Sequence, residues 1–335
     1  MYSSTFFCIK KNNFVTTPNK NDKGVKQVLL YLKKILNDLG KCFDDRDKSY
    51  PLDLGNHQIN HLLFADDLLL LSENKEGLQH CLNKLNSYYF TWRLQINLKK
   101  TKIMIFSKGK KDYSKYHFFQ NNSQIEIVER YKYLGIVFYF NGNLKHAADD
   151  LYNKALKAFF SVKSKFNNFQ EVPLKTCLKL FDSLLKPILT YGSEIWLSDY
   201  NINLNNFDNL PIEKLQHKML KCILGVKRQS SNMASRLECN RSPMLIFSLC
   251  LMYNYYMRLV KINRDRILYS AFTTDQDLAQ ENSKCWFSTL NKIFKILKLD
   301  IKDLADNSIF RNNLIESYHQ QSDTTTKNLI WGCRQ

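Results

Sequence analysis

The chain has 335 residues, enough for one to three domains, and its 49 Lys and Arg against 31 Asp and Glu give a net charge of +18. This excess favours a polyanionic partner, with nucleic acid ahead of an anionic membrane surface. Nine cysteines without a C-x-x-C pair argue against a disulfide framework or a zinc ribbon. The start of the chain does not resemble a signal peptide, and its most apolar window, 62–71, is too short to span a bilayer. We therefore expect a cytoplasmic or nuclear protein with reduced thiols and no membrane association.

The first third of the chain predicts an extended start, one helix and one hairpin. Residues 1–23 read as extended, and leucine and isoleucine then recur at helical spacing from Leu29 to Leu39, where Gly40 suits a helix end. Residues 60–72 read as two short strands joined at Asp66-Asp67.

The Asp pair is the feature that points to chemistry, because it sits inside the apolar run Leu62 to Leu71. Unpaired buried carboxylates are costly, and two adjacent ones also repel each other. A divalent cation such as Mg²⁺ would compensate them. The alternative is a turn at which water solvates both carboxylates, and on spacing alone the two readings are about equally good.

The middle of the chain alternates helix and strand. A helix is predicted from Glu73, with Leu78, Leu82, Leu85 and Tyr89 on one face. A strand is predicted around 103–106, and 125–128 is predicted to pair with 133–140 in a second hairpin.

Beyond Asn143 the pattern is helical almost throughout. An amphipathic helix is predicted over 147–168, and Ser242-Pro243 suits the start of a long helix that reaches about Lys261. We expect a boundary near 143 and a softer one near 200, in an Asn-rich stretch, with a flexible loop at 320–328. The histidines lack metal-ligand spacing and are interpreted as structural.

Four segments together resemble the palm of reverse transcriptases from non-LTR retrotransposons. They are Phe64-Ala65-Asp66-Asp67, the Trp92 to Asn97 segment, Lys100-Thr101-Lys102 and Tyr133-Leu134-Gly135. The resemblance continues through 187–196, 223–226, 231–234 and 241–243, and covers roughly residues 1–250. It implies an α+β fold: a partial palm at 1–143, a thumb-like helical region at 144–200 and a helical C-terminal region at 201–335.

The resemblance also implies roles for single residues in a two-metal transfer of nucleotides to a primer 3′-hydroxyl. Asp66 and Asp67 would hold two Mg²⁺ ions, and Lys102 would neutralise or protonate the departing pyrophosphate. The nucleotide pocket would include Gln27, Phe64 and Ala65. The partners would be an RNA template and a DNA primer, held by Tyr133, Leu134 and Gly135; no protein partner is indicated.

The sequence departs from the family in one decisive respect. Only 23 residues precede Gly24-Val25-Lys26-Gln27, which matches the opening of a later family motif, and these lack the first catalytic motif with its carboxylate. Asp22, Asp44 and Asp45 do not lie where that carboxylate is expected. We therefore expect a sheet that lacks a strand and a chain that is inactive alone.

Two alternatives to an active polymerase stay open. The first is a basic RNA- or DNA-binding module, for which Lys154 and Lys157 of the 147–168 helix, with Lys163 and Lys165, would follow a phosphate backbone. The second is a poorly folded product of a decayed element.

Overall fold

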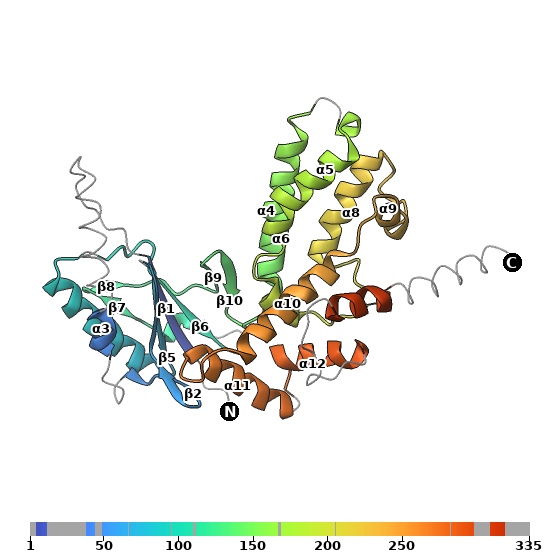
Figure 1. The fold of residues 1–335 in the computed structure, drawn as a ribbon. Helices are drawn as coiled ribbons and strands as arrows, with labels where there is room; N and C mark the ends of the chain where they lie inside the picture. Colours follow the sequence, from blue (N-terminus) through green and yellow to red (C-terminus); the bar gives the residue numbers. More distant parts are fainter. Residues whose placement is uncertain are drawn as a thin grey trace, which may run out of the picture. The chain divides into compact units, whose positions relative to one another are not determined.

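The computed structural model divides the chain into two compact units, Met1–Asn143 and Leu144–Gln335 (Figure 1). It describes residues 38–43, 49–65, 67–94, 96–109, 112–166, 169–204, 206–281, 283–297 and 309–318, and the backbone of 5–11. Strands dominate the first unit and helices the second, which confirms the predicted α+β class. The predicted helix at 29–39, except its last two residues, and the predicted loop at 320–328 lie outside the described residues.

The first unit is built on a four-stranded antiparallel sheet. Its strands are β4 (His61–Phe64), β5 (Asp67–Ser72), β1 (Thr5–Lys11) and β6 (Lys102–Phe106), in this spatial order. The β4–β5 hairpin confirms the predicted one, but Asp67, which was predicted to lie in the turn, belongs to β5 and pairs with Phe64. The strand predicted at 103–106 is confirmed by β6.

The expectation that the sheet lacks a strand is wrong. β1 pairs with β5 along its length, from Phe6 opposite Ser72 to Lys11 opposite Asp67. On its other side β1 pairs with β6, from Thr5 opposite Phe106 to Ile9 opposite Lys102. The inner position between the hairpin and β6 is therefore filled, and β5 presents no open edge. What the first 11 residues lack is a carboxylate, not a strand.

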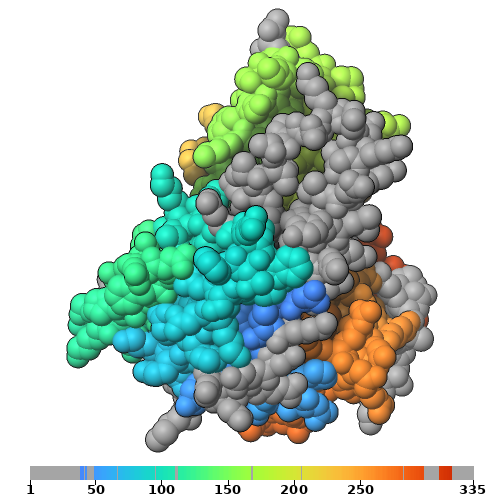
Figure 2. Space-filling model, turned by 90° about the vertical axis from the view of Figure 1, so that its left-hand side faces the viewer, coloured from blue at the N-terminus to red at the C-terminus, as the bar shows by residue number. Residues whose placement is uncertain are grey.

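Both faces of β5 are buried, which explains its unbroken apolar sequence. Leu68 and Leu70 pack on one face in a core that includes Ile103, Ile105 and the buried side of α3 (Lys75–Thr91). Leu69 and Leu71 pack on the other face with Ile59 and Tyr133. In the space-filling view the cyan to green segments of the first unit form one continuous surface (Figure 2).

Helix α3 confirms the helix predicted after Glu73. The side chain of Asn74 accepts a hydrogen bond from the Gly77 amide at 2.8 Å and caps the helix, so Glu73 lies just outside it. Leu78, Leu82 and Leu85 are fully buried, as their spacing predicts.

Replacing Gly77 by alanine is expected to destabilise the protein by about 1–3 kcal/mol, because it overpacks a tight contact. A Cβ at this position would lie 2.4 Å from the Ser49 carbonyl oxygen and 2.4 Å from Ser72 Oγ. Helix propensity alone predicts the opposite, a gain of about 0.8–1 kcal/mol. Urea unfolding followed by circular dichroism decides between them, with Gly109→Ala as control because nothing lies within 4 Å of that position.

The Tyr-Leu-Gly turn forms a second hairpin, but from other residues than predicted. β9 (Arg130–Tyr133) pairs with β10 (Ile136–Tyr139) across Leu134-Gly135. Residues 125–128, which were predicted to pair here, instead lie beside β6, with Ile127 bridged to Ile103. The two-residue turn fixes this register, since it pairs Tyr133 directly with Ile136.

Shorter elements complete the first unit. They are the 3-10 turns η1 (Gly40–Phe43) and η2 (Tyr113–Lys115) and the strand pairs β2 (Leu52–Leu54) with β3 (His57–Ile59) and β7 (Phe119–Gln120) with β8 (Ser123–Gln124).

The second unit is a helical assembly in which α4 packs on both α6 and α8 (Figure 1). The helices are α4 (Lys145–Lys163), α5 (Leu174–Leu180), α6 (Lys186–Leu189), α7 (Ser193–Trp196), α8 (Pro211–Leu224), α9 (Asn232–Glu238), α10 (Met244–Val260), α11 (Ile267–Gln280) and α12 (Trp286–Leu297). Short turns η3 (Phe169–Glu171) and η5 (Leu197–Asp199) connect them, and residues 309–318 form a last helix. α4 ends at Lys163, five residues before the predicted end.

One helix of this unit changes its winding. Between α5 and α6 the segment η4 (Phe181–Leu185) forms a π turn, and Pro187 follows in the first turn of α6. Proline has no amide hydrogen and its ring crowds the preceding turn of an α-helix. The wider π turn gives the chain room at this point, and such turns often mark functional sites.

α10 confirms the long helix predicted after Ser242-Pro243, but its N-terminus is not capped by Ser242. Instead, the carboxylate of Glu213 on α8 accepts a hydrogen bond from the Leu245 amide at 2.7 Å. Of the helices in the described part of the chain, none combines the length and apolar character needed to cross a membrane.

Candidate functional site: the hairpin end of the sheet and a basic groove

Asp67, one of the two predicted catalytic carboxylates, lies at the tip of the β4–β5 hairpin. Asp67 is the first residue of β5 and is 8% exposed, whereas Phe64 is 61% exposed. Ala65 has a φ of +51°, as a tight two-residue hairpin turn requires. Asp66 and Gln27 lie outside the described residues, so their predicted roles stay predictions.

Strand register brings Asp67 and Lys102 to the same end and the same face of the sheet. Asp67 pairs with Lys11 of β1, and Lys102 pairs with Ile9, two positions away on the same strand. Directly paired residues and their second neighbours along a strand share a face. Lys102 also forms an ion pair with the exposed Glu126, so a carboxylate already compensates its charge.

The Tyr133-Leu134-Gly135 turn lies beside this end of the sheet. Burial raises the pKa of the Tyr133 hydroxyl, and the nearby charge of Asp67 raises it further. Leu134 and Gly135 both have positive φ, at +46° and +87°. A bulky residue rarely adopts this conformation, so Leu134 is held there at an energetic cost while its side chain stays partly exposed.

The described residues do not supply a two-metal site. No group of three or more His, Cys, Asp or Glu gathers at metal-binding distance among them. Asp67 is the one carboxylate of the sheet strands at this end, and its partner position on β1 is a lysine. The oxygen ligands of Asp66 and Asp67 suit Mg²⁺, but β1 contributes no second carboxylate segment.

A basic groove of about 520 Å³ runs along α8 in the second unit. Its cations Lys214, Lys218 and Lys221 repeat at helical spacing along α8, and Arg228 follows the helix; Tyr152 of α4 lies opposite. Lys218 Nζ lies 4.7 Å from the centre of the Phe160 ring of α4, and that ring is half exposed. Cations interleaved with exposed aromatic rings are typical of nucleic-acid surfaces.

The two lysines predicted from the sequence lie on α4 and are not among the residues that line this groove. Lys157 is exposed, and Lys154 forms an ion pair with Asp150 one turn earlier. The lysines of α8 were missed, although their spacing in the sequence was a usable signal. Glu126, the partner of Lys102, was also missed and carries no local signal, because it lies 24 residues away.

Asp208 and His217, which line the groove, form a polar cluster with buried Arg236. Arg236 Nη1 donates to Asp208 at 3.0 Å and also to His217 Nε2. Burial, together with the neighbouring charge of Arg236, lowers the pKa of His217 to about 4. His217 is therefore neutral and accepts at Nε2, which agrees with a structural role.

Comparison with known proteins gives a match within the first unit. Residues 28–138 match the family model of reverse transcriptase (RNA-dependent DNA polymerase). This segment contains the β4–β5 hairpin, Lys102 and the Tyr133 turn, and begins after β1. This match supports the predicted resemblance of the segment to reverse transcriptases.

A curated relative is itself described as transposon-derived. A transposon-derived protein of Caenorhabditis elegans is 27% identical over 178 residues, which are 52% of this chain and 62% of the relative. The match therefore spans less than two thirds of the relative's length. Together with the family match it supports a reverse transcriptase of a retrotransposon.

Proposed function

We propose that this chain derives from the reverse transcriptase of a non-LTR retrotransposon and acts as a nucleic-acid-binding protein that does not extend primers by itself. Its first unit corresponds to a palm, and the helices from 144 onward correspond to a thumb and C-terminal region. The RNA template and DNA primer of the family would be its partners.

The observation that carries the proposal is the sheet order β4-β5-β1-β6 with Asp67 and Lys102 on one face at one end. An acidic hairpin beside a strand with a basic residue is the arrangement that nucleotidyl transfer needs for metal binding and charge neutralisation. The family match over the same elements supports this reading.

The absence of activity follows from β1. Its sequence Thr-Phe-Phe-Cys-Ile-Lys-Lys offers no oxygen ligand of the carboxylate type next to Asp67. Two metal ions about 3.5–4 Å apart need carboxylates from more than one segment. A misplacement of about 1 Å already costs about 10²-fold in rate, and a missing ligand costs more.

Nucleic-acid binding follows from the groove along α8, together with the net charge of +18. Each phosphate that a lysine neutralises releases counterions, so binding falls steeply with salt. A binding role therefore survives even where the catalytic end is incomplete.

We expect that the purified chain does not extend a DNA primer on an RNA template with Mg²⁺, and that it still binds this duplex in a salt-dependent way. Asp67→Asn is expected to leave both results unchanged, because Asp67 has no second carboxylate segment with which to hold metal. Gel-resolved primer extension and fluorescence anisotropy across a salt series measure the two properties.

Two controls sharpen this experiment. The double variant Lys214→Gln/Lys218→Gln is expected to weaken nucleic-acid binding about tenfold at low salt and to reduce the dependence of affinity on salt. The matched control is Lys175→Gln/Lys261→Gln, which removes two positive charges from exposed positions outside the groove and so has the same net charge as the first variant. Extension by the unaltered chain that Asp67→Asn removes, but exposed Asp53→Asn does not, would instead establish an active polymerase.

A further inference from the structure

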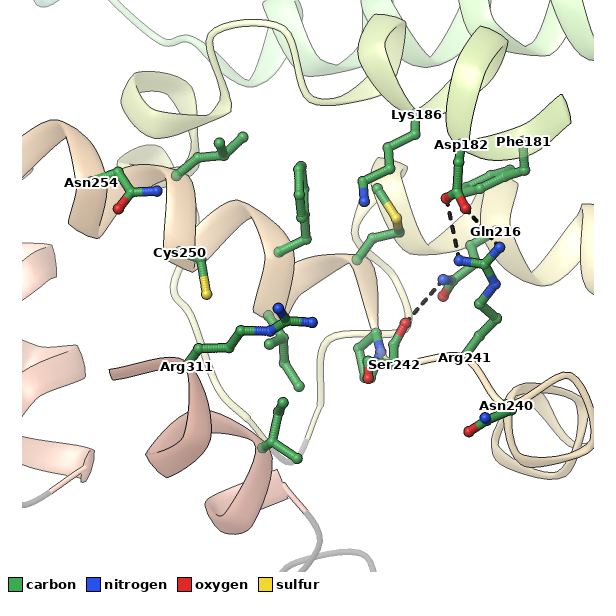
Figure 3. A pocket seen from close by; sticks show the side chains of 16 residues that line it. Phe181, Asp182, Lys186, Gln216, Asn240, Arg241, Ser242, Cys250, Asn254 and Arg311 are labelled. Atoms are coloured by element: carbon green, nitrogen blue, oxygen red, sulfur yellow. Dashed lines mark hydrogen bonds and ion pairs between the residues drawn. The ribbon is translucent and has the colours of Figure 1, made fainter. Parts of the chain in front are cut away.

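A second pocket of the helical unit, with a volume of about 500 Å³, is not used by the proposed function (Figure 3). It lies between the π turn, the segment that precedes α10, α10 itself and the helix at 309–318. Its charged side chains come from three separate parts of the chain: Asp182, Lys186, Arg241 and Arg311.

The pocket carries more positive than negative charge. Its one carboxylate, Asp182, accepts from Arg241 Nη1 at 3.2 Å and from Nη2 at 2.8 Å. This bidentate pair compensates Arg241 and fixes its guanidinium. Within the described part of the chain, neither Lys186 nor Arg311 has a carboxylate partner in an ion pair.

Burial and the neighbouring charges change the pKa of Lys186. Burial lowers the pKa of its ammonium; Asp182 opposes this effect, and Arg241 and Arg311 lower the pKa further. Cations that lie close together repel each other, and an anion bound between them relieves this repulsion.

The cations are held in place before any ligand arrives. Lys186 lies directly after the π turn, with Nζ 3.5 Å from the centre of the Phe247 ring. Arg311 follows Phe310, which is fully buried and stacks on Tyr253 of α10 at 4.3 Å between ring centres. In Figure 3 the side chains of Lys186 and Arg311 extend into the same space. Such preorganisation reduces the entropic cost of binding.

We propose that this pocket binds a phosphate group of a nucleic-acid strand through Lys186 and Arg311, with Arg241 as a third, oriented cation. An ammonium and a guanidinium fork match the oxygens of phosphate. The volume also accommodates the sugar attached to the phosphate, beside the polar side chains of Asn254 and Gln216. The claim that the phosphate belongs to a nucleic-acid strand rests on the proposed function, whereas the claim that the pocket binds phosphate rests on the pocket itself.

The test uses the full chain and three probes: single-stranded RNA, adenosine monophosphate and inorganic phosphate. Lys186→Gln and Arg311→Gln are each expected to weaken RNA binding about tenfold, which corresponds to about 1.4 kcal/mol. Lys179→Gln and Arg264→Gln remove the same charges from exposed positions outside the pocket and are expected to change affinity less than twofold. Anisotropy measures RNA, and calorimetry measures the two small probes.

The possible outcomes separate this inference from the proposed function. RNA binding that responds equally to pocket and control variants overturns the pocket and leaves nucleic-acid binding intact. If the small probes bind in a way that depends on Lys186 and Arg311 while RNA does not bind, the pocket is a phosphate site, but its phosphate does not belong to a nucleic-acid strand. Failure of all three probes overturns the pocket. Circular dichroism of each variant verifies that it folds.

Discussion

Phe310→Ala is expected to lower the free energy of unfolding of the helical unit by about 3–5 kcal/mol, the usual cost of removing a fully buried aromatic ring. The ring is 0% exposed, stacks on Tyr253 with an interplanar angle of 13° and meets the edge of Phe294 at 5.9 Å. It ties the helix at 309–318 to α10 and α12. Urea unfolding followed by tryptophan fluorescence measures the loss, since buried Trp196 lies in this unit, and Trp92→Phe as background removes the signal of Trp92 in the first unit.

The neighbouring Ile309 provides the matched control. Ile309→Ala is expected to change stability by less than about 0.5 kcal/mol, because this side chain is 49% exposed. Equal losses for both variants would mean that the helix at 309–318 is not anchored through Phe310. Since Phe310 also positions Arg311, we expect the phosphate affinity of the Phe310 variant to fall together with its stability.

Glu213→Ala is expected to cost about 2–4 kcal/mol, because it removes the cap of α10 and leaves a cavity beside Arg236. Glu213 is 0% exposed and accepts from the Leu245 amide, and its Oε2 lies 3.5 Å from Arg236 Nη1. The same urea titration measures the loss. Exposed Glu238→Ala on α9 is the control and should be nearly neutral; a similar loss there would refute the capping argument.

The same residue gives stability a pH dependence that Glu213→Gln should remove. Burial raises the pKa of Glu213 to about 8, although Leu245 and Arg236 act against the shift. The folded state thus retains a proton that the unfolded state has lost, so this contribution to stability disappears as pH rises toward 8. His217, whose pKa is lowered to about 4, has the opposite effect below pH 6.5. The decline is therefore visible between pH 6.5 and 8.

Several elements follow from sequence because their causes are local. Asn74 and the spacing of Leu78, Leu82 and Leu85 are sufficient to predict α3. The β4–β5 hairpin follows from two apolar runs on either side of the Asp pair. The second hairpin was misplaced on one side: 125–128 was predicted to pair with 133–140, whereas the tight turn pairs 130–133 with 136–139 and leaves Ile127 beside Ile103.

The candidate site was predictable in part. The sequence places Asp67, Lys102 and Tyr133 in one family pattern, and pairing register puts Asp67 and Lys102 at one end of the sheet. The Glu126 partner of Lys102 and the groove along α8 were not predicted, since each joins residues from distant parts of the chain.

The sequence by itself therefore determined the reverse transcriptase resemblance, the helices and the acidic hairpin, because periodicity, caps and short motifs act within a few residues. Only the tertiary structure decided that β1 fills the inner position of the sheet and that Lys186 and Arg311 face one pocket. Both results depend on non-local contacts, β1 with β5 and Phe310 with Tyr253. Packing of this kind fixes which distant segments meet, and no local pattern encodes it.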